Sequence, residues 1–260
     1  MKALGVAHLT ALQLAPADLV RQAAGAGFSA VGLRLHPAMA GGLCYPLDAA
    51  ARQALKAVLN SEGVRVSDIE FVELTPQVDL LALVPLLEAG ADLGASSLTV
   101  SGDDGEFSRL TDHYAHLCEL AADFGVRVDL EFMRWREVGN LQQARQIVEG
   151  AGQANGGILL DALHLFRSGG KVAMVREVNP RWLRAVQLCD APLQAPPPQH
   201  IIQEAREGRL PPGRGQLPLA ELLAALPKDV QVSVEMPYGA LGSVERLALA
   251  CQTTHALVAP

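Results

Sequence analysis

Several features are scarce in this chain of 260 residues, and each scarcity excludes a class of protein. Charged residues make up 19% of the sequence and hydrophobic residues 50%, so a substantial core is available and a disordered chain is not expected. The net charge of −7 argues against nucleic-acid binding, because neutralising phosphates takes clustered lysine and arginine. No run of about 18 residues stays apolar enough to span a bilayer.

Cysteines are few and widely separated. Cys44, Cys118, Cys189 and Cys251 form no CxxC pair, which favours single buried or half-buried thiols over a disulfide framework. No GxSxG elbow appears and no cysteine lies beside a plausible histidine partner, so nucleophilic catalysis finds little support. Zinc-finger and HExxH spacings are also missing. The apolar run within residues 1–10 is too short for a secretory signal and is typical of a first strand, so we expect a soluble cytoplasmic protein.

Short β-rich runs alternate with longer segments of helical periodicity along the whole chain. The runs predicted to be strands are Ala3–His8, Ala30–His36, Val64–Val72, Ser97–Ser101, Val126–Phe132, Gly157–Asp161, Arg184–Leu188 and Val230–Glu235. The segments predicted to be helices are Pro16–Ala26, Leu47–Glu62, Val78–Leu93, Phe107–Phe124, Leu141–Gly150 and Leu241–Val258. Strands that alternate with helices pair in parallel, because each helix serves as the crossover between two strands.

Near-continuous apolar strands such as GGILL and VQVSV are typical of a parallel sheet that is covered on both faces. A single-domain (β/α)8 barrel over residues 1–260 is therefore the leading fold, and the length suits it. A doubly wound open sheet is the alternative. Its usual dinucleotide fingerprint is missing, since AHLTALQLAP follows the first strand.

One connection is unusually long. Residues 190–218 are rich in proline, glycine and arginine, and they include a short helical piece, IIQEAREG. The segment follows the seventh strand and should lie over the face where barrel active sites form. With Arg206, Arg209 and Arg214 it is a candidate lid or binding loop, and an exposed insertion with scattered arginines is the alternative.

Four strands each end in a side chain that can bind a metal ion. Glu131, Asp161, Gln187 and Glu235 follow the runs VRVDL, GGILL, RAV and VQVSV. In a parallel barrel all carboxyl ends of the strands open on one face, so these four oxygen donors should converge there. Three carboxylates and an amide suit a hard or borderline divalent cation.

Glu131 and Glu235 carry the sharper hypothesis. A lone carboxylate at the end of a buried strand is costly unless a cation or hydrogen bonds compensate it. Two such groups on opposite sides of a bound carbonyl compound could also move protons, while the metal stabilises the enediolate. Structural salt bridges with arginines are the alternative.

Other polar residues near strand ends are weaker candidates for substrate contact. His164 follows Asp161 in LLDALHL, in the loop or first turn behind the strand, where it can face the substrate. Glu137 can orient a substrate hydroxyl or pair with an arginine. His8 and His36 end the first two strands and can line the pocket, or they are ordinary strand-end residues.

The series of strand ends resembles the xylose isomerase-like TIM barrels over nearly the whole chain. The segments LLDALHLFRSGG, VQLCDAP and RLPPGRGQLPL are the most similar in character. That superfamily contains sugar-phosphate isomerases and epimerases, ketose 3-epimerases, inosose dehydratases and isomerases, hydroxypyruvate isomerase and endonuclease IV. We do not expect DNA repair, because endonuclease IV needs many histidine ligands, and the 7 histidines of this chain mostly fall elsewhere.

The resemblance implies one divalent metal ion held by Glu131, Asp161, Gln187 and Glu235, with the two glutamates doubling as acid–base groups. It also implies that His164 and Glu137 contact the substrate. The chain departs from the family at Gln187, where histidine is usual; an amide oxygen is a harder ligand, which favours Mn²⁺ or Mg²⁺ over Zn²⁺ or Co²⁺. It departs again at Arg214, which replaces an acid.

These observations predict a metal-dependent isomerase or epimerase of a small sugar, sugar phosphate or polyol ketone. Arg209 and Arg214 would hold a phosphate or carboxylate of the substrate. A dehydratase of the 3-dehydroshikimate or inosose type is the alternative, favoured by Gln187, which resembles the arrangement in some 3-dehydroshikimate dehydratases. A non-catalytic metabolite binder is the third. The sequence predicts neither a nucleic-acid nor a membrane partner, and it leaves open a homo-oligomer, the form common in this superfamily.

Overall fold

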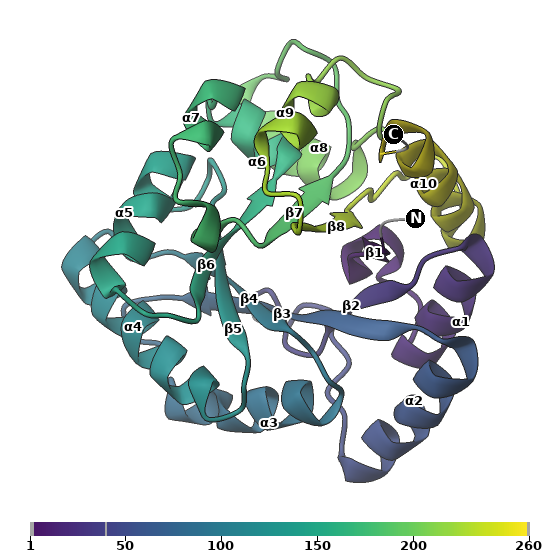
Figure 1. Ribbon diagram of the computed structural model, residues 1–260, viewed down its shortest axis with the longest axis horizontal. Coiled ribbons are helices and arrows are strands. Elements are labelled where there is room, and N and C mark those ends of the chain that lie inside the picture. The colour runs from purple at the N-terminus through teal and green to yellow at the C-terminus, as the bar shows by residue number, and fades with distance from the viewer. Residues whose placement is uncertain (1–2, 40, 259–260) are drawn as a thin grey trace.

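The computed structural model describes residues 3–39 and 41–258 and forms a closed barrel of eight parallel strands. The strands pair in chain order, and β1 closes the barrel by pairing with β8. Figure 1 shows the strands in the centre of the molecule and the helices around them. The predicted closed (β/α)8 barrel is therefore confirmed, and the open-sheet alternative is wrong.

All eight predicted strands form, with ends that differ from the predicted ends by at most a few residues. They are β1 Leu4–Val6, β2 Ala30–Arg34, β3 Arg65–Leu74, β4 Ser97–Gly102, β5 Arg127–Glu131, β6 Gly156–Asp161, β7 Ala185–Leu188 and β8 Gln231–Val234. Nearly every strand residue is buried, as expected for a parallel sheet that side chains cover on both faces.

Long helices cover the outside of the barrel, and shorter helices lie within the connecting segments (Figure 1). The α-helices are α1 Pro16–Ala26, α2 Ala49–Glu62, α3 Val84–Asp92, α4 Phe107–Ala122, α5 Leu141–Ala151, α6 Ala162–Arg167, α7 Val172–Arg176, α8 Ile201–Glu207, α9 Leu219–Ala225 and α10 Ser243–Val258. Short 3-10 helices cover His8–Ala11, Leu81–Leu83, Pro180–Trp182 and Pro198–His200. None of the helices in the described ranges has the length and apolar character needed to cross a bilayer.

Local chemistry explains where several of these helices begin and end. The side chains of Asp48 and Asn140 accept a hydrogen bond from the first turns of α2 and α5, which satisfies amides that a helix leaves free. Gly63 and Gly152 end the same helices in the left-handed conformation, with φ of 65° at both positions.

The short helices α6, α7 and α9 were not predicted, because each is too brief for its periodicity to stand out. Asp161 is both the last residue of β6 and the N-cap of α6, and its side chain accepts a hydrogen bond from the His164 amide. His164 therefore lies in the first turn behind the strand, one of the two placements that we expected.

A buried tyrosine ties helix α4 to two neighbouring strands. The Tyr114 hydroxyl donates a hydrogen bond to the carbonyl of Val128 on β5 (2.8 Å). It accepts another from the amide of Gly157 on β6 (2.9 Å). One polar atom therefore satisfies backbone groups of two adjacent strands beneath the helix.

We expect Tyr114→Phe to lower the free energy of unfolding by about 1–3 kcal/mol, because it leaves a buried amide without an acceptor. Chemical denaturation measures the change. Tyr238→Phe is the control: this half-buried hydroxyl forms no hydrogen bond to a described residue, so its loss should cost less than about 0.5 kcal/mol. Equal effects of the two substitutions would contradict the assignment.

Candidate active site at the carboxyl ends of the strands

A cavity of about 390 Å³ opens at the carboxyl ends of the barrel strands. One part of its wall is ionic and is formed mainly by strand ends and by the segment after β7. The other part is apolar and is formed by side chains that include Leu9, Met39, Phe71, Met133 and Trp135. This is the face on which barrel enzymes carry their active sites.

The four predicted metal ligands lie at adjacent strand ends. Glu131 is the last residue of β5, Asp161 ends β6, and Gln187 pairs with Asp161 in the register of β6 and β7. Glu235 directly follows β8, where its amide donates a hydrogen bond to the Leu188 carbonyl on β7. All four side chains are buried, and all except Asp161 line the cavity.

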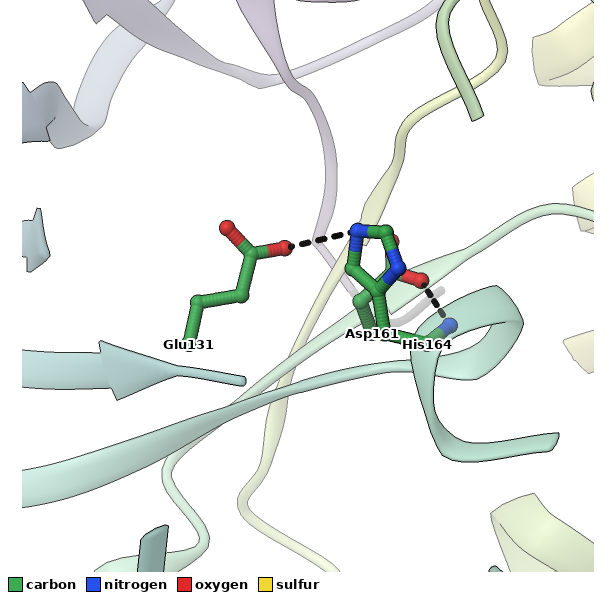
Figure 2. A group of neighbouring side chains, drawn as sticks. All are labelled: Glu131, Asp161 and His164. Carbon is green, nitrogen blue, oxygen red and sulfur yellow. Dashed lines mark hydrogen bonds and ion pairs between the residues drawn. The ribbon is translucent and has the colours of Figure 1, made fainter. Parts of the chain in front are cut away.

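Glu131, Asp161 and His164 lie close together at this site (Figure 2). One ligand atom from each of the three lies within 4.8 Å of the other two. His164 Nε2 is 3.7 Å from Glu131 Oε1, while the His164 amide donates to Asp161 Oδ1 at 2.8 Å. The ring centroids of Trp135 and His164 lie 5.1 Å apart, and the two ring planes are nearly perpendicular, at 81°.

Arg209 enters the same cluster from the segment that follows β7. Its Nη1 donates to Asp161 Oδ2 at 2.5 Å, and its Nη2 lies 2.6 Å from Glu235 Oε2. Its Nε donates to the carbonyl of Ala205 on α8. The guanidinium is only 1% exposed, so a full positive charge is buried between two of the four predicted metal ligands.

The pKa values of the acids reflect an excess of buried negative charge. Burial and the nearby carboxylates of Glu235 and Asp161 raise the pKa of Glu131 well above its usual range. Burial raises the pKa of Glu235 to about 7, although Arg209 opposes the shift. Burial is the largest single influence on Asp161 and opposes its ionisation, but Arg209 and His164 together lower that pKa. Burial lowers the pKa of His164 to about 4, so the imidazole is neutral near pH 7.

Two unsatisfied oxygens indicate that these residues fit a divalent cation. Glu131 Oε1 and Gln187 Oε1 are fully buried and accept no hydrogen bond from the described residues. Such atoms are costly to bury unless something binds them. A hard cation satisfies carboxylate and amide oxygens alike, and both atoms belong to the predicted set of ligands.

The segment after β7 is held firmly over the cavity. Asp190 is buried, and its carboxylate accepts hydrogen bonds from the amides of Ala191, Gly213 and Leu217. A second anchor is the bidentate pair between Arg167 on α6 and Glu204 on α8, with both contacts at 2.7 Å. These anchors fix α8 and the residues that follow it, Arg209 among them, so the segment forms an ordered strap.

Four residues that we predicted to contact substrate lie elsewhere. His8 is buried, and both ring nitrogens face the backbone, at the Leu14 carbonyl and the Arg34 amide. His36 is half-buried against the Phe71 carbonyl. Neither histidine is among the described residues that line the cavity. Glu137 and Arg214 are exposed, and they do not line it either. His164 and Arg209 do line the cavity.

The structure also brings an unexpected ion pair to the cavity. Arg34 of β2 contacts Glu70 of β3 through Nε and Nη2, and both side chains are buried. A charged residue inside the apolar run AVGLRL was the available signal for Arg34. Glu70 lies in the middle of the alternating run SDIEFVEL, where its pairing across strands could not be anticipated.

The chain belongs to the xylose isomerase-like TIM barrel family, whose model matches residues 20–252. The match covers most of the barrel, from α1 into α10. It therefore confirms the family that the strand-end residues resemble.

The chain is similar in part to two enzymes, a 3-dehydroshikimate dehydratase and an inosose isomerase. A 3-dehydroshikimate dehydratase of Pseudomonas aeruginosa is 34% identical over 139 residues, which cover 53% of this chain and 22% of that protein. An inosose isomerase of Bacillus velezensis is 28% identical over 151 residues, covering 55% of this chain and 52% of that protein. The match thus spans about half of the isomerase and less of the dehydratase.

A solved structure shares the fold over nearly the full length. It is the IolI protein with a bound zinc atom, with a TM-score of 0.81 and 20% sequence identity. The superposition covers 99% of this chain and 98% of that protein.

We expect Asp190→Asn to loosen the strap, because the amide cannot accept all three backbone hydrogen bonds. The free energy of unfolding should fall by about 1–3 kcal/mol, and amide exchange should speed up within residues 190–218. Hydrogen exchange with peptide resolution measures this. Asp229→Asn, which alters an exposed ion pair with Arg184, should leave exchange in the strap unchanged.

Proposed function

We propose that the protein is a divalent-metal-dependent enzyme that removes the proton next to the carbonyl of a small hydroxy ketone. The first candidate reaction is dehydration of a cyclic substrate of the 3-dehydroshikimate type. Isomerisation or epimerisation of a small sugar, sugar phosphate or polyol ketone is the second. The observation that carries the proposal is the pair of buried, unsatisfied oxygens on Glu131 and Gln187 beside two further carboxylates.

The proposed metal ligands are Glu131, Asp161, Gln187 and Glu235, and Mn²⁺ or Mg²⁺ is favoured because all four donors are oxygens. A bound ion supplies a Lewis acid that lowers the cost of negative charge on the carbonyl oxygen of the substrate. The charge of the site supports a divalent ion. Two buried guanidiniums face four buried carboxylates here, which gives the site a formal charge of −2. The guanidiniums are those of Arg34 and Arg209, and the carboxylates are those of Glu70, Glu131, Asp161 and Glu235.

The side chains around the cavity can perform both proton transfers. Glu131 or Glu235 takes the proton from the carbon next to the carbonyl, and the electron pair of that bond delocalises into the carbonyl group. In the dehydration, this electron pair then forms a carbon–carbon double bond as the hydroxyl on the next carbon leaves. That hydroxyl takes up a proton and departs as water. In the isomerisation, the second glutamate returns the proton to a different atom or face instead.

His164 is placed to contact a hydroxyl group of the substrate. Its neutral imidazole lines the cavity beside Glu131 and offers one donor and one acceptor nitrogen. The ring packs against Trp135 in a nearly perpendicular arrangement, so a hydroxyl would meet a positioned partner. We therefore propose His164 as a substrate-binding residue.

Two observations favour dehydration of a ring over isomerisation of an open-chain sugar. The similarity to the dehydratase is higher in sequence identity than the similarity to the isomerase. The cavity also has a broad apolar wall that includes Phe71, Met133 and Trp135. Such a wall suits the face of a carbon ring better than a chain of hydroxyl groups, which would lose hydrogen bonds to water there.

We expect the purified protein to bind one Mn²⁺ or Mg²⁺ ion and to lose its activity when a chelator removes that ion. Activity should return when the metal is added back. The direct measurement is the metal content of wild-type protein and of Glu131→Gln. If wild-type protein binds no divalent cation in the micromolar to millimolar range, the proposed function is wrong.

Glu131→Gln should reduce turnover by about a hundredfold to ten-thousandfold, because it removes a ligand and a proton acceptor together. Glu149→Gln is the matched control: it makes the same chemical change on an exposed face of α5 and should keep full activity. A steady-state assay with each variant makes the comparison. Full activity of Glu131→Gln would contradict the proposed role.

The product distinguishes the two candidate reactions. Incubation with 3-dehydroshikimate and Mn²⁺ should generate a conjugated ring with strong near-ultraviolet absorbance as water is lost. A parallel panel of ketoses and inososes tests for isomerisation by change in chromatographic mobility. Turnover of a ketose without any absorbance from 3-dehydroshikimate would reverse the order of the two candidates.

A further inference from the structure

We propose that Arg209 is an internal counter-cation that competes with the metal ion for Asp161 and Glu235, and thereby sets the affinity of the site for metal. The inference rests on the proposed function, because it takes these two carboxylates as metal ligands. It concerns a different property, namely what the chain itself supplies to the ligands when no metal is bound.

The four proposed ligands form two pairs that differ in whether another side chain already binds them. Glu131 and Gln187 each present a buried oxygen that no described residue satisfies. Asp161 and Glu235 are instead bridged by one guanidinium, through contacts of 2.5 Å and 2.6 Å. One half of the site is therefore open to a cation, and a side chain already fills the other half.

Asp161 in particular has little capacity left for another cation. Its Oδ1 accepts the hydrogen bond of the His164 amide, and its Oδ2 accepts that of Arg209 Nη1. A divalent ion that bound Asp161 Oδ2 would lie within a few ångströms of the guanidinium. Because two cations repel strongly in a buried site, binding of the ion and retention of both Arg209 contacts oppose each other.

The cavity offers space into which the Arg209 guanidinium can move when the metal binds. Arg209 lines the cavity, and its Nη2 already approaches His164 Nε2 at 3.4 Å. Its Nε donates to the carbonyl of Ala205, and because the guanidinium is planar and rigid, a turn of the end group exchanges this hydrogen bond along with the two carboxylate contacts. A turn toward the open cavity releases Asp161 and Glu235 without moving the strap.

Competition of this kind predicts the direction in which metal affinity changes when Arg209 is replaced. Removing the guanidinium should raise the affinity for metal, since the ion no longer has to displace a cation. It should also destabilise the metal-free protein, because two buried carboxylates lose their partner. If Arg209 instead supported the ligands in the metal-bound state, its removal would weaken metal binding.

The test is Arg209→Met, which keeps most of the side-chain volume and removes the charge. Isothermal titration with Mn²⁺ should give a dissociation constant at least about tenfold lower than that of wild-type protein, a conservative figure for close buried charge pairs. The melting temperature of the metal-free variant should fall, and saturating Mn²⁺ should raise it by more than it raises that of wild-type protein. Unchanged or weaker Mn²⁺ binding by the variant would overturn the inference.

Arg206→Met is the matched control. Arg206 lies on α8, three residues before Arg209, and lines the same cavity, but it is exposed and forms no ion pair with a described residue. Its removal deletes the same charge from the same region without touching a proposed ligand. The Mn²⁺ affinity of Arg206→Met should differ from wild type by less than about threefold. A gain as large as that of Arg209→Met would mean that net charge, and not competition for the ligands, sets the affinity.

A measurement on wild-type protein covers the case in which Arg209→Met does not fold. In a crystal structure with bound Mn²⁺, the guanidinium should have left hydrogen-bond distance of at least one of Asp161 and Glu235. Retention of both contacts beside a bound ion would refute the competition while leaving the proposed function intact. Absence of Mn²⁺ binding in both wild-type protein and Arg209→Met would refute both.

Discussion

The candidate active site depends on the burial of more negative than positive charge at the mouth of a closed barrel. Glu70, Glu131, Asp161 and Glu235 share this space with two guanidiniums, those of Arg34 and Arg209. Burial makes each ionised carboxylate expensive, and the raised pKa values of Glu131 and Glu235 express that cost. The rest of the site can be understood as a set of partners for these acids.

The barrel makes this concentration of charge possible. Parallel strands bring their carboxyl ends to one face, so residues separated by about a hundred positions in the chain become neighbours. The apolar strands beneath, buried on both faces, supply the stability that offsets the unfavourable cluster. The strap after β7 then adds Arg209 from above, held by Asp190 and by the Arg167–Glu204 pair.

Much of this could be predicted from the sequence, since strand periodicity and glycine stops are local signals. The same logic gave the positions of Glu131, Asp161, Gln187 and Glu235, because each polar side chain ends an apolar run. The partners of these side chains could not be predicted. Pairings such as Arg209 with Asp161 join segments 48 residues apart, and they depend on how a loop returns over the barrel. His8 lies at a strand end as well, but the first loop turns its ring toward the backbone.

The position of Arg209 changes how the proline- and arginine-rich segment is understood. The expectation was a lid whose arginines reach for an anionic substrate, but Arg214 is exposed and does not line the cavity. Arg209 is buried and directed at carboxylates of the protein itself, an arrangement that stabilises the barrel mouth when no cation is present. A segment that supplies this charge must be ordered before any ligand arrives. Its buried anchors, Asp190 and Arg167, give it that order, and so the segment belongs to the site as fully as the strand ends do.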